Sequence, residues 1–317
     1  MKRGFAAALL PLVLVAVLGP ACRASAQYED LSFKLGAEGG YLSGSTTYRI
    51  TIPSQQGLFE SELVWPLDSW LAGLRATVEK EGRWSLDLVL RTNISEETGA
   101  MEDSDWQDGE KYVYSESDTT QDRFSALIVD GSGRYHFLQR EGWSLGGVAG
   151  FLYQTFDLTA SDLNQFSPVG FTEFNAVVDG PVVTYRVTSA IPYGGLCLLR
   201  QASEALTIGA DALLGYAFVA DEDDHLLRFK LSTAEADGPA VMLRLRGSYI
   251  FGDSYGLGGV WSVDGALEYL RADTTGSQDQ IFYAGQDAGL GFAGIADEID
   301  TSQVTVTAGV SYRFRSY

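Results

Sequence analysis

The chain has 317 residues, a formal net charge of −20 and 45% apolar residues, with 16 Phe and 16 Tyr but two Cys. So acidic a chain should repel nucleic acid and anionic surfaces and attract cationic partners. Beyond residue 27 no apolar run is long enough for a spanning helix, which excludes a helical membrane protein. A periplasmic or secreted all-β protein and an outer-membrane barrel remain.

Residues 1–26 have the features of a secretory signal peptide. A basic start precedes an apolar run over 5–18, and Ala24-Ser25-Ala26 forms an A-x-A cleavage site before Gln27. Cys22 offers a lipoprotein-type cleavage as an alternative, although Gly19 stands where such signals normally carry an aliphatic residue. We predict cleavage before Gln27, which leaves 27–317 as the mature chain.

Maturation changes both the charge and the cysteine content. The leader contains Lys2, Arg3 and Arg23, so its loss lowers the formal charge from −20 to −23. It also removes Cys22, which leaves Cys197 without a partner for an intramolecular disulfide.

Several segments alternate between apolar and polar residues with a period of two. The apolar positions are Trp84, Leu86, Leu88 and Leu90 in the first segment, the even positions from Leu206 to Phe218 in the second, and Val304, Val306, Ala308, Val310, Tyr312 and Phe314 in the third. In a barrel, one face of such a strand meets lipid and the other a polar interior. A sandwich strand is the alternative, but the aromatic pair close to the last residue favours the barrel.

Short polar turns alternate with longer connections along the chain. The turns lie at 79–83, 139–142, 200–205 and 251–256, and the longer connections near 50–58, 94–123, 158–182, 221–238 and 273–301. This spacing predicts a single all-β domain, a ten-stranded antiparallel transmembrane β-barrel with long extracellular loops and both termini on one side. The long connections would face the cell exterior because periplasmic turns are short.

An acidic pair lies in MEDSDW, residues 101–106. Asp103 and Asp105 are two residues apart and share one strand face, with the same odd parity as the interior side of the strand that starts at Trp84. A bulge between them and that strand would break the match. Alone, the pair indicates a solvated loop or a weak divalent-cation contact.

A second acidic stretch, VADEDDHLLR, covers residues 219–228. If the strand from Leu206 continues, Asp221, Asp223 and His225 project into the interior, while Glu222 and Asp224 point away. From residue 206 to 223 the strand would rise about 40 Å along the membrane normal, against an apolar band of about 25 Å. These residues would therefore stand above the membrane.

The two acidic groups together predict hydrolytic chemistry. A histidine held by an aspartate can act as a general base, and two close carboxylates can share a proton and hold a water. Asp103 and Asp105 with Asp223 and His225 would form a water-activating site that uses no serine or cysteine nucleophile.

These residues resemble the omptin family of outer-membrane proteases. The D-x-D followed by Trp106 is similar to the family's paired aspartates, and the D-x-H of Asp223 and His225 to its Asp-His dyad. Supporting matches are Leu42-Ser43-Gly44 with Thr46, the S-x-L-x-W of Ser61, Leu63 and Trp65, and AGVSYRF at 308–314. They follow the family's order along the mature chain.

The resemblance implies an aspartic-type (Asp/His) endopeptidase of the outer membrane, with its active-site cleft facing the extracellular side and with no cofactor or metal. A water between the two aspartates and the dyad would attack the peptide carbonyl, with His225 as the base and Asp223 orienting it. The family binds a basic substrate residue with a Glu and an Asp. Asp221 matches the Asp, but Tyr48 stands where the Glu is expected, so both are candidate substrate-binding residues.

Peptide or protein substrates are the implied partners, and the net charge favours cationic ones. The family also binds lipopolysaccharide through basic residues, whereas Thr155 and Thr188 stand at the expected arginine positions, which leaves lipopolysaccharide dependence open.

Other functions compete with the protease hypothesis. The acidic mouth could act as an adhesin or receptor for cationic ligands, with a calcium-binding loop as a variant. A channel is less favoured because side chains such as Asp87, Arg91 and Asp211 could fill the narrow interior of ten strands. No role is assigned to His136.

Overall fold

The computed structural model describes residues 31–54, 57–80, 82–118, 124–253 and 259–315, so the predicted signal peptide and Gln27 lie outside the described residues. Within these ranges the chain forms thirteen β-strands and one short 3-10 helix. The strands are β1 (Leu31–Ser54), β2 (Gly57–Pro66), β3 (Ser69–Lys80), β4 (Trp84–Asn93), β5 (Ala100–Gln107), β6 (Glu110–Asp118), β7 (Ser125–Arg140), β8 (Trp143–Phe166), β9 (Ala176–Gln201), β10 (Leu206–His225), β11 (Lys230–Asp253), β12 (Gly259–Phe282) and β13 (Gly291–Arg315), with η2 (Thr172–Phe174) between β8 and β9.

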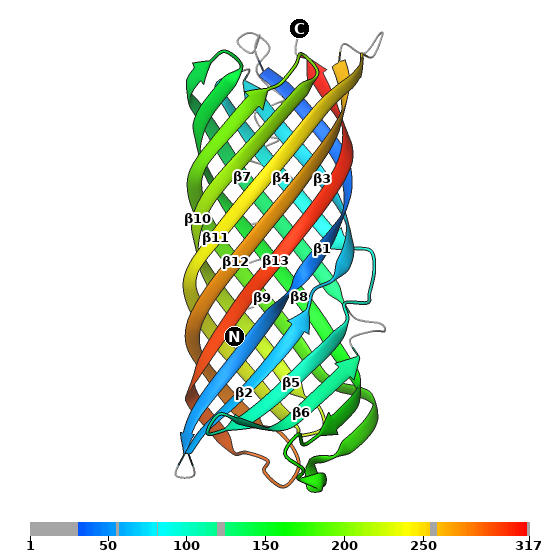
Figure 1. Cartoon of the computed structure of the whole chain (residues 1–317), viewed down its shortest axis with the longest axis vertical. Coiled ribbons are helices and arrows are strands. Elements are labelled where there is room, and N and C mark those ends of the chain that lie inside the picture. The colour runs from blue at the N-terminus through cyan, green and yellow to red at the C-terminus, as the bar shows by residue number, and fades with distance from the viewer. Residues whose placement is uncertain (1–30, 55–56, 81, 119–123, 254–258, 316–317) are drawn as a thin grey trace.

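The strands form one closed antiparallel barrel. β1 pairs along one edge with β13 and along the other with β2 and then β3, so β2 and β3 occupy a single position in the ring. β4 with β5, and β6 with β7, share positions in the same way between β2/β3 and β8. The ring therefore has ten strand positions and closes between β13 and β1 (Figure 1), which confirms the predicted fold class. Among the described residues, no helix has the length and hydrophobicity needed to cross a membrane.

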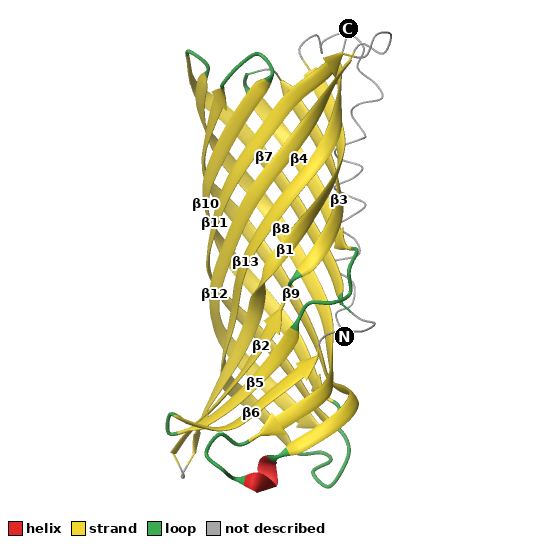
Figure 2. Ribbon diagram, turned by 45° about the vertical axis from the view of Figure 1, so that its right-hand side comes forward, coloured by secondary structure: helices red, strands yellow, loops and turns green. Residues whose placement is uncertain are grey.

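The two ends of the barrel differ. The described chain begins and ends at one of them, where Ser32 pairs with Arg315; we call this the terminal end. The opposite end, which we call the loop end, carries the connections after β1, β5, β8, β10 and β12 and lies at the bottom of Figure 1. Figure 2 shows the single short helix at the loop end.

The strand alternation follows the expected period. On β10, Leu213 is buried in the barrel whereas its neighbour Leu214 is 70% exposed on the outer wall. Leu74, Leu196 and Val306 are likewise exposed although apolar. An outer wall of this composition is suited to lipid, which is the solvent of a membrane barrel.

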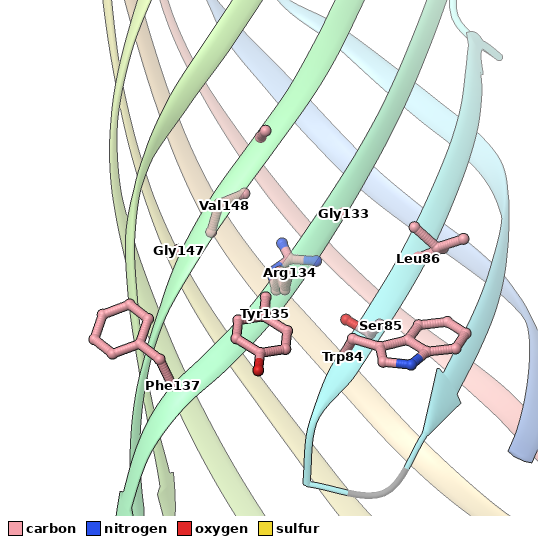
Figure 3. Close-up of a pocket in the computed structure, with 10 residues that line it drawn as sticks. Trp84, Ser85, Leu86, Gly133, Arg134, Tyr135, Phe137, Gly147 and Val148 are labelled. Atoms are coloured by element: carbon pink, nitrogen blue, oxygen red, sulfur yellow. The ribbon is translucent and has the colours of Figure 1, made fainter.

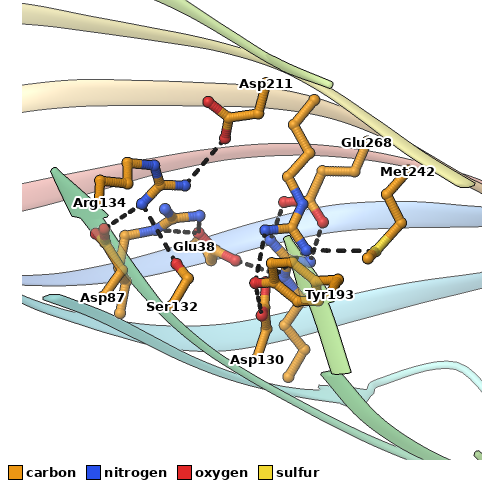
Figure 4. A network of polar contacts seen from close by, with 12 residues as sticks. Glu38, Asp87, Asp130, Ser132, Arg134, Tyr193, Asp211, Met242 and Glu268 are labelled. Atoms are coloured by element: carbon orange, nitrogen blue, oxygen red, sulfur yellow. Dashed lines mark hydrogen bonds and ion pairs between the residues drawn. The ribbon is translucent and has the colours of Figure 1, made fainter. Parts of the chain in front are cut away.

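Charged side chains fill the barrel interior between the terminal end and the acidic residues of β10, in a network that joins several strands (Figure 4). Arg134 on β7 pairs with Asp87 and reaches Asp211 on β10 at 3.0 Å. Arg91 on β4 pairs with Glu268 on β12 at 2.8 Å. The Arg134–Asp211 and Arg91–Glu268 contacts join strands that are not neighbours, so they cross the interior, whereas Arg134 and Asp87 lie on the neighbouring strands β7 and β4. These side chains fill the interior as predicted and argue against a diffusion channel.

The predicted loop boundaries are wrong, because most residues assigned to long connections belong to strands. The connection placed at 221–238 shrinks to 226–229 between β10 and β11, and the one placed at 273–301 shrinks to 283–290 between β12 and β13. Hairpin pairing continues past the apolar band because each strand still finds its antiparallel partner. The polar residues at the loop end are consequently held on the barrel wall.

Candidate active site

The Asp223–His225 pair lies on the inner face of β10, near the loop end. The carboxylate of Asp223 is fully buried, and its Oδ2 atom is 2.8 Å from Nε2 of His225, which is 7% exposed. The same oxygen accepts a hydrogen bond of 2.5 Å from the Tyr48 hydroxyl on β1. The Tyr48 hydroxyl and the imidazole of His225 therefore both lie against one carboxylate oxygen.

The electrostatics of this pair favour an ionised aspartate beside a neutral imidazole. Burial alone would raise the pKa of Asp223, but His225, Lys230 and Tyr48 together hold it below its usual value. Burial lowers the pKa of His225, as do the cations Lys230 and Arg228, and Asp223 opposes them only in part. The imidazole is thus able to accept a proton at neutral pH.

Asp103 and Asp105 lie on β5, two ring positions from Tyr48. Leu63 of β2 pairs with Tyr48 on one side and with Asp103 on the other. Asp105 is 9% exposed, and the buried Oδ1 atom of Asp103 has no hydrogen-bond partner among the described residues. Between β4 and β5 the residues 94–99 form a connection and not a continued strand, yet Asp103 and Asp105 keep the predicted odd parity on β5. The register shift on β5 falls after them, between Asp105 and Trp106.

The Asp103–Asp105 couple is electrostatically linked to the dyad. Burial and then the charge of Asp105 raise the pKa of Asp103 to about 7, with Asp223 adding to the rise and Arg228 and Lys230 opposing it. With a pKa of about 7, the Asp103 carboxyl group is about half protonated at neutral pH. The structure therefore brings all four predicted catalytic residues into one section of the barrel interior.

Asp221 lies two residues before the dyad on the same face. Its Oδ2 atom accepts a hydrogen bond from the Tyr185 hydroxyl and its Oδ1 atom one from the backbone N–H of Ala234, both at 3.0 Å. Burial and the charge of Asp297 raise its pKa to about 8. The predicted substrate-binding aspartate is thus buried beside a second carboxyl group.

That second carboxyl group, Asp297 on β13, was missed by the sequence reasoning. It is 2% exposed, neither oxygen has a hydrogen-bond partner among the described residues, and burial raises its pKa to about 7. The signal was present: the odd positions Thr305 and Thr307 form the polar face of the C-terminal strand, and the same parity extended backwards reaches Asp297. It was hidden because 273–301 was assigned to a loop.

Lys230 was missed as well. It is the register partner of His225 across the β10–β11 pair, so both side chains project from the same face of the sheet. Burial lowers the pKa of Lys230, whereas the nearby charges of Asp223, Asp103 and Asp105 raise it. A cation therefore lies among the candidate catalytic carboxylates. Its position directly after the acidic stretch, in HLLRFK, was the available signal.

Tyr48 differs from the role predicted for it. It was expected to contact substrate at the position of a missing glutamate, but its hydroxyl is engaged with Asp223 and the residue is 2% exposed. Its ring packs at 5.6 Å against Tyr185, which stacks on Trp65 at 5.2 Å. These three rings connect the dyad to the Asp221 side of the site.

Thr155 and Thr188, which stand where lipid-binding arginines were sought, are register partners on β8 and β9 and form a 3.2 Å hydrogen bond to each other. They contribute no charge to the outer wall.

A surface groove lies near the terminal end of the barrel, away from these residues. It has a volume of about 660 Å³ and is lined by Trp84, Leu86, Tyr135 and Phe137 beside the turns of the terminal end (Figure 3). Most of these side chains are apolar, and Leu86, Tyr135 and Phe137 are exposed on the outer wall. The groove therefore belongs to the lipid-facing surface.

Comparison with solved structures identifies similar barrels. The outer membrane protease OmpT from Escherichia coli superposes with a TM-score of 0.71 at 16% identity, over 92% of this chain and 99% of that chain. The translocator domain of the autotransporter NalP from Neisseria meningitidis gives a TM-score of 0.39 at 12% identity, over 97% and 96% of the two chains. A search among curated proteins gives no match.

The family assignment rests on a match that spans nearly the whole chain beyond the predicted signal peptide. The model of the omptin family matches residues 29–314, a range that contains both acidic motifs and the strands from β1 to β12, and β13 except for Arg315. The likeness to the OmpT structure independently supports the same ten-position barrel. The chain therefore belongs to the omptin family of outer-membrane proteases.

Proposed function

We propose that this protein is an endopeptidase that hydrolyses peptide bonds with a water activated between the Asp223–His225 dyad and the Asp103–Asp105 couple. The observation that carries the proposal is the convergence of the two groups. β5 and β10 are far apart in the ring, yet Tyr48 links them: its hydroxyl reaches Asp223 at 2.5 Å, and Leu63 of β2 pairs with both Tyr48 and Asp103.

His225 is the general base. Its Nε2 atom faces Asp223, so the neutral ring carries its proton on Nε2 and leaves Nδ1 as the acceptor. Attack of water on the substrate carbonyl carbon transfers a water proton to Nδ1. The ionised Asp223 stabilises the resulting imidazolium.

The Asp103–Asp105 couple supplies the complementary acid. When Asp103 is protonated, its carboxyl group donates a hydrogen bond to the developing oxyanion, and its Oδ1 atom, which has no hydrogen-bond partner among the described residues, would accept one from the attacking water. Collapse of the tetrahedral intermediate breaks the C–N bond, and the imidazolium returns its proton to the leaving amine. The step consumes one water and leaves both acid–base groups in their starting states.

Substrates with a basic residue at the cleavage site fit the acidic subsite formed by Asp221 and Asp297. Two buried carboxyl groups with pKa values of about 8 and 7 share protons in the free protein, and an arriving guanidinium would favour their ionised forms. Asp297 supplies the second carboxylate that Tyr48 lacks. Basic specificity is therefore retained in this proposal, and it strengthens as pH rises.

The loop end would face the cell exterior. The exposed apolar wall lies toward the terminal end, and the candidate catalytic residues lie beyond it toward the loop end. Outer-membrane barrels place their short turns in the periplasm. The site would then meet peptides or proteins outside the cell, without nucleic acid as a partner.

The test is cleavage of a mixed peptide library by the refolded barrel in detergent, with and without lipopolysaccharide. His225→Ala and Asp103→Ala should each lower cleavage at least about 100-fold, since general acid–base groups contribute that much or more. Glu222→Ala is the matched control, because Glu222 lies on β10 between Asp221 and Asp223 but on the exposed outer face.

Heat-dependent migration on a gel establishes that each variant is folded. A folded wild type that cleaves nothing under either condition would instead support a receptor for cationic ligands.

A further inference from the structure

Tyr48, on β1, contacts the dyad from a distant strand. Its hydroxyl donates to Oδ2 of Asp223 at 2.5 Å, the oxygen that also faces Nε2 of His225. Among the described residues, Tyr48 and His225 are the two side chains that contact this carboxylate, whose Oδ1 atom is buried without a partner. One oxygen is therefore bound by the Tyr48 hydroxyl and lies next to the imidazole, whereas the other has no hydrogen-bond partner among the described residues.

The phenol is held firmly in place. Tyr48 pairs with Leu63 of β2 and with Ile299 of β13, both of which are buried. Its ring packs against Tyr185, which in turn stacks on Trp65. With strands fixed on both edges and an aromatic ring beside it, the hydroxyl has little freedom to leave Asp223.

The hydroxyl also remains a donor throughout the working pH range. Burial, followed by the charge and hydrogen bond of Asp223, raises the pKa of Tyr48 well above its ordinary value. A neutral phenol beside a carboxylate donates its proton and stabilises the charged form. A glutamate at this position would instead place a second negative charge against Asp223.

We propose that Tyr48 is a positioning residue that fixes the orientation of Asp223 and makes the Asp223–His225 couple less basic, and that it has no part in binding the substrate side chain. This inference rests on the proposed function of the dyad. This role explains why a tyrosine can replace the expected glutamate. Asp297 on β13 supplies the second carboxylate of the acidic subsite, so the residue at position 48 is not needed there and can bind Asp223 instead.

The other charged and titratable groups around Asp223 must be kept constant in any test. They are His225 and Asp221 on its own strand, Lys230 on β11, Arg228 in the connection before it, Asp103 and Asp105 on β5, and Tyr185 on β9. Removal of one hydroxyl group, by Tyr48→Phe, leaves all of them in place and keeps the ring.

Tyr48→Phe should shift the acidic limb of the kcat/KM profile upward by about one pH unit, because loss of a charge-assisted donor makes the coupled pair more basic. We expect kcat on the plateau to fall about tenfold, with KM changed less than about twofold, because the loss acts on geometry in the transition state. Tyr185→Phe is the matched control: it removes a hydroxyl bound to Asp221, so it should alter KM for basic substrates and leave the acidic limb in place.

A second measurement separates this inference from the proposed function. The chain contains two histidines, so the imidazole resonance of His225 can be assigned with a His136→Asn variant and titrated by NMR without any substrate. The apparent pKa of His225 should be higher in Tyr48→Phe than in the wild type. An unmoved titration together with a raised KM would overturn the inference and return Tyr48 to substrate binding. A wild type without peptidase activity would overturn the proposed function alone, because the titration still reports on the hydrogen bond.

Discussion

Ionisation of the buried Asp297 carboxyl group should lower the stability of the folded barrel at high pH, and replacing Asp297 should remove this loss of stability. The pKa of Asp297 is about 7 against an ordinary value of 3.8. Since the unfolded chain releases this proton at lower pH than the folded barrel, stability falls as pH rises through the interval between the two values. At about 1.4 kcal/mol for each pKa unit, the loss near pH 8 approaches about 4 kcal/mol.

Asp297→Asn removes the titration but retains a side chain of the same shape. Relative to the wild type, we expect the variant to be about 2–4 kcal/mol more stable near pH 8 than near pH 4, that is, its free energy of unfolding rises by this amount against that of the wild type. Comparing two pH values cancels any cost of the buried amide itself. The same variant should lose about 10- to 100-fold of its preference for Arg or Lys at the cleavage site, because one charge-assisted contact is removed.

The assay is denaturant unfolding of the refolded barrel in detergent, followed by tryptophan fluorescence between about pH 4 and pH 8. Asp273→Asn is the control, because Asp273 is half exposed and pairs with the exposed Arg271 at 2.9 Å. Its stability difference should change by less than about 0.5 kcal/mol over this range. A stability difference between Asp297→Asn and the wild type that does not change with pH, or that moves against the variant as pH rises from 4 to 8, would refute the reasoning.

Further predictions concern Lys230, the aspartate couple and the lipid. Lys230→Met should lower kcat/KM about 10- to 100-fold and shift the apparent pKa of the Asp103 couple upward, since the ammonium lowers that pKa; an unchanged pH profile would contradict this. The kcat/KM profile of the wild type should be bell-shaped with a basic limb beginning near pH 7, where Asp103 titrates, and Asp103→Asn should lose that limb along with most of the activity. Peptide cleavage should change less than about threefold when lipopolysaccharide is added, because Thr155 and Thr188 offer it no charge; a strict requirement for the lipid in the library assay would show that other residues bind it.

The sequence by itself determined the barrel and the face on which several site residues lie. A strand has a period of two, so the apolar even positions of 206–218 were enough to place Asp221, Asp223 and His225 inside. The same alternation placed Asp103 and Asp105 on the inner face. It did not show where the strands end, because polar residues beyond the lipid are compatible with a loop or with a continued hairpin.

Only the tertiary structure decided which inward residues meet. Tyr48 and Asp223 are separated by 175 positions in the chain, and Asp297 lies close to Asp221 although β13 and β10 are not neighbours. Such contacts cross the interior of the barrel, so they depend on the register and stagger of all ten strand positions together. The alternation of residues predicts that a side chain points inward. The closed ring sets its position along the barrel axis, and that position decides whether Tyr48 contacts the substrate or the dyad.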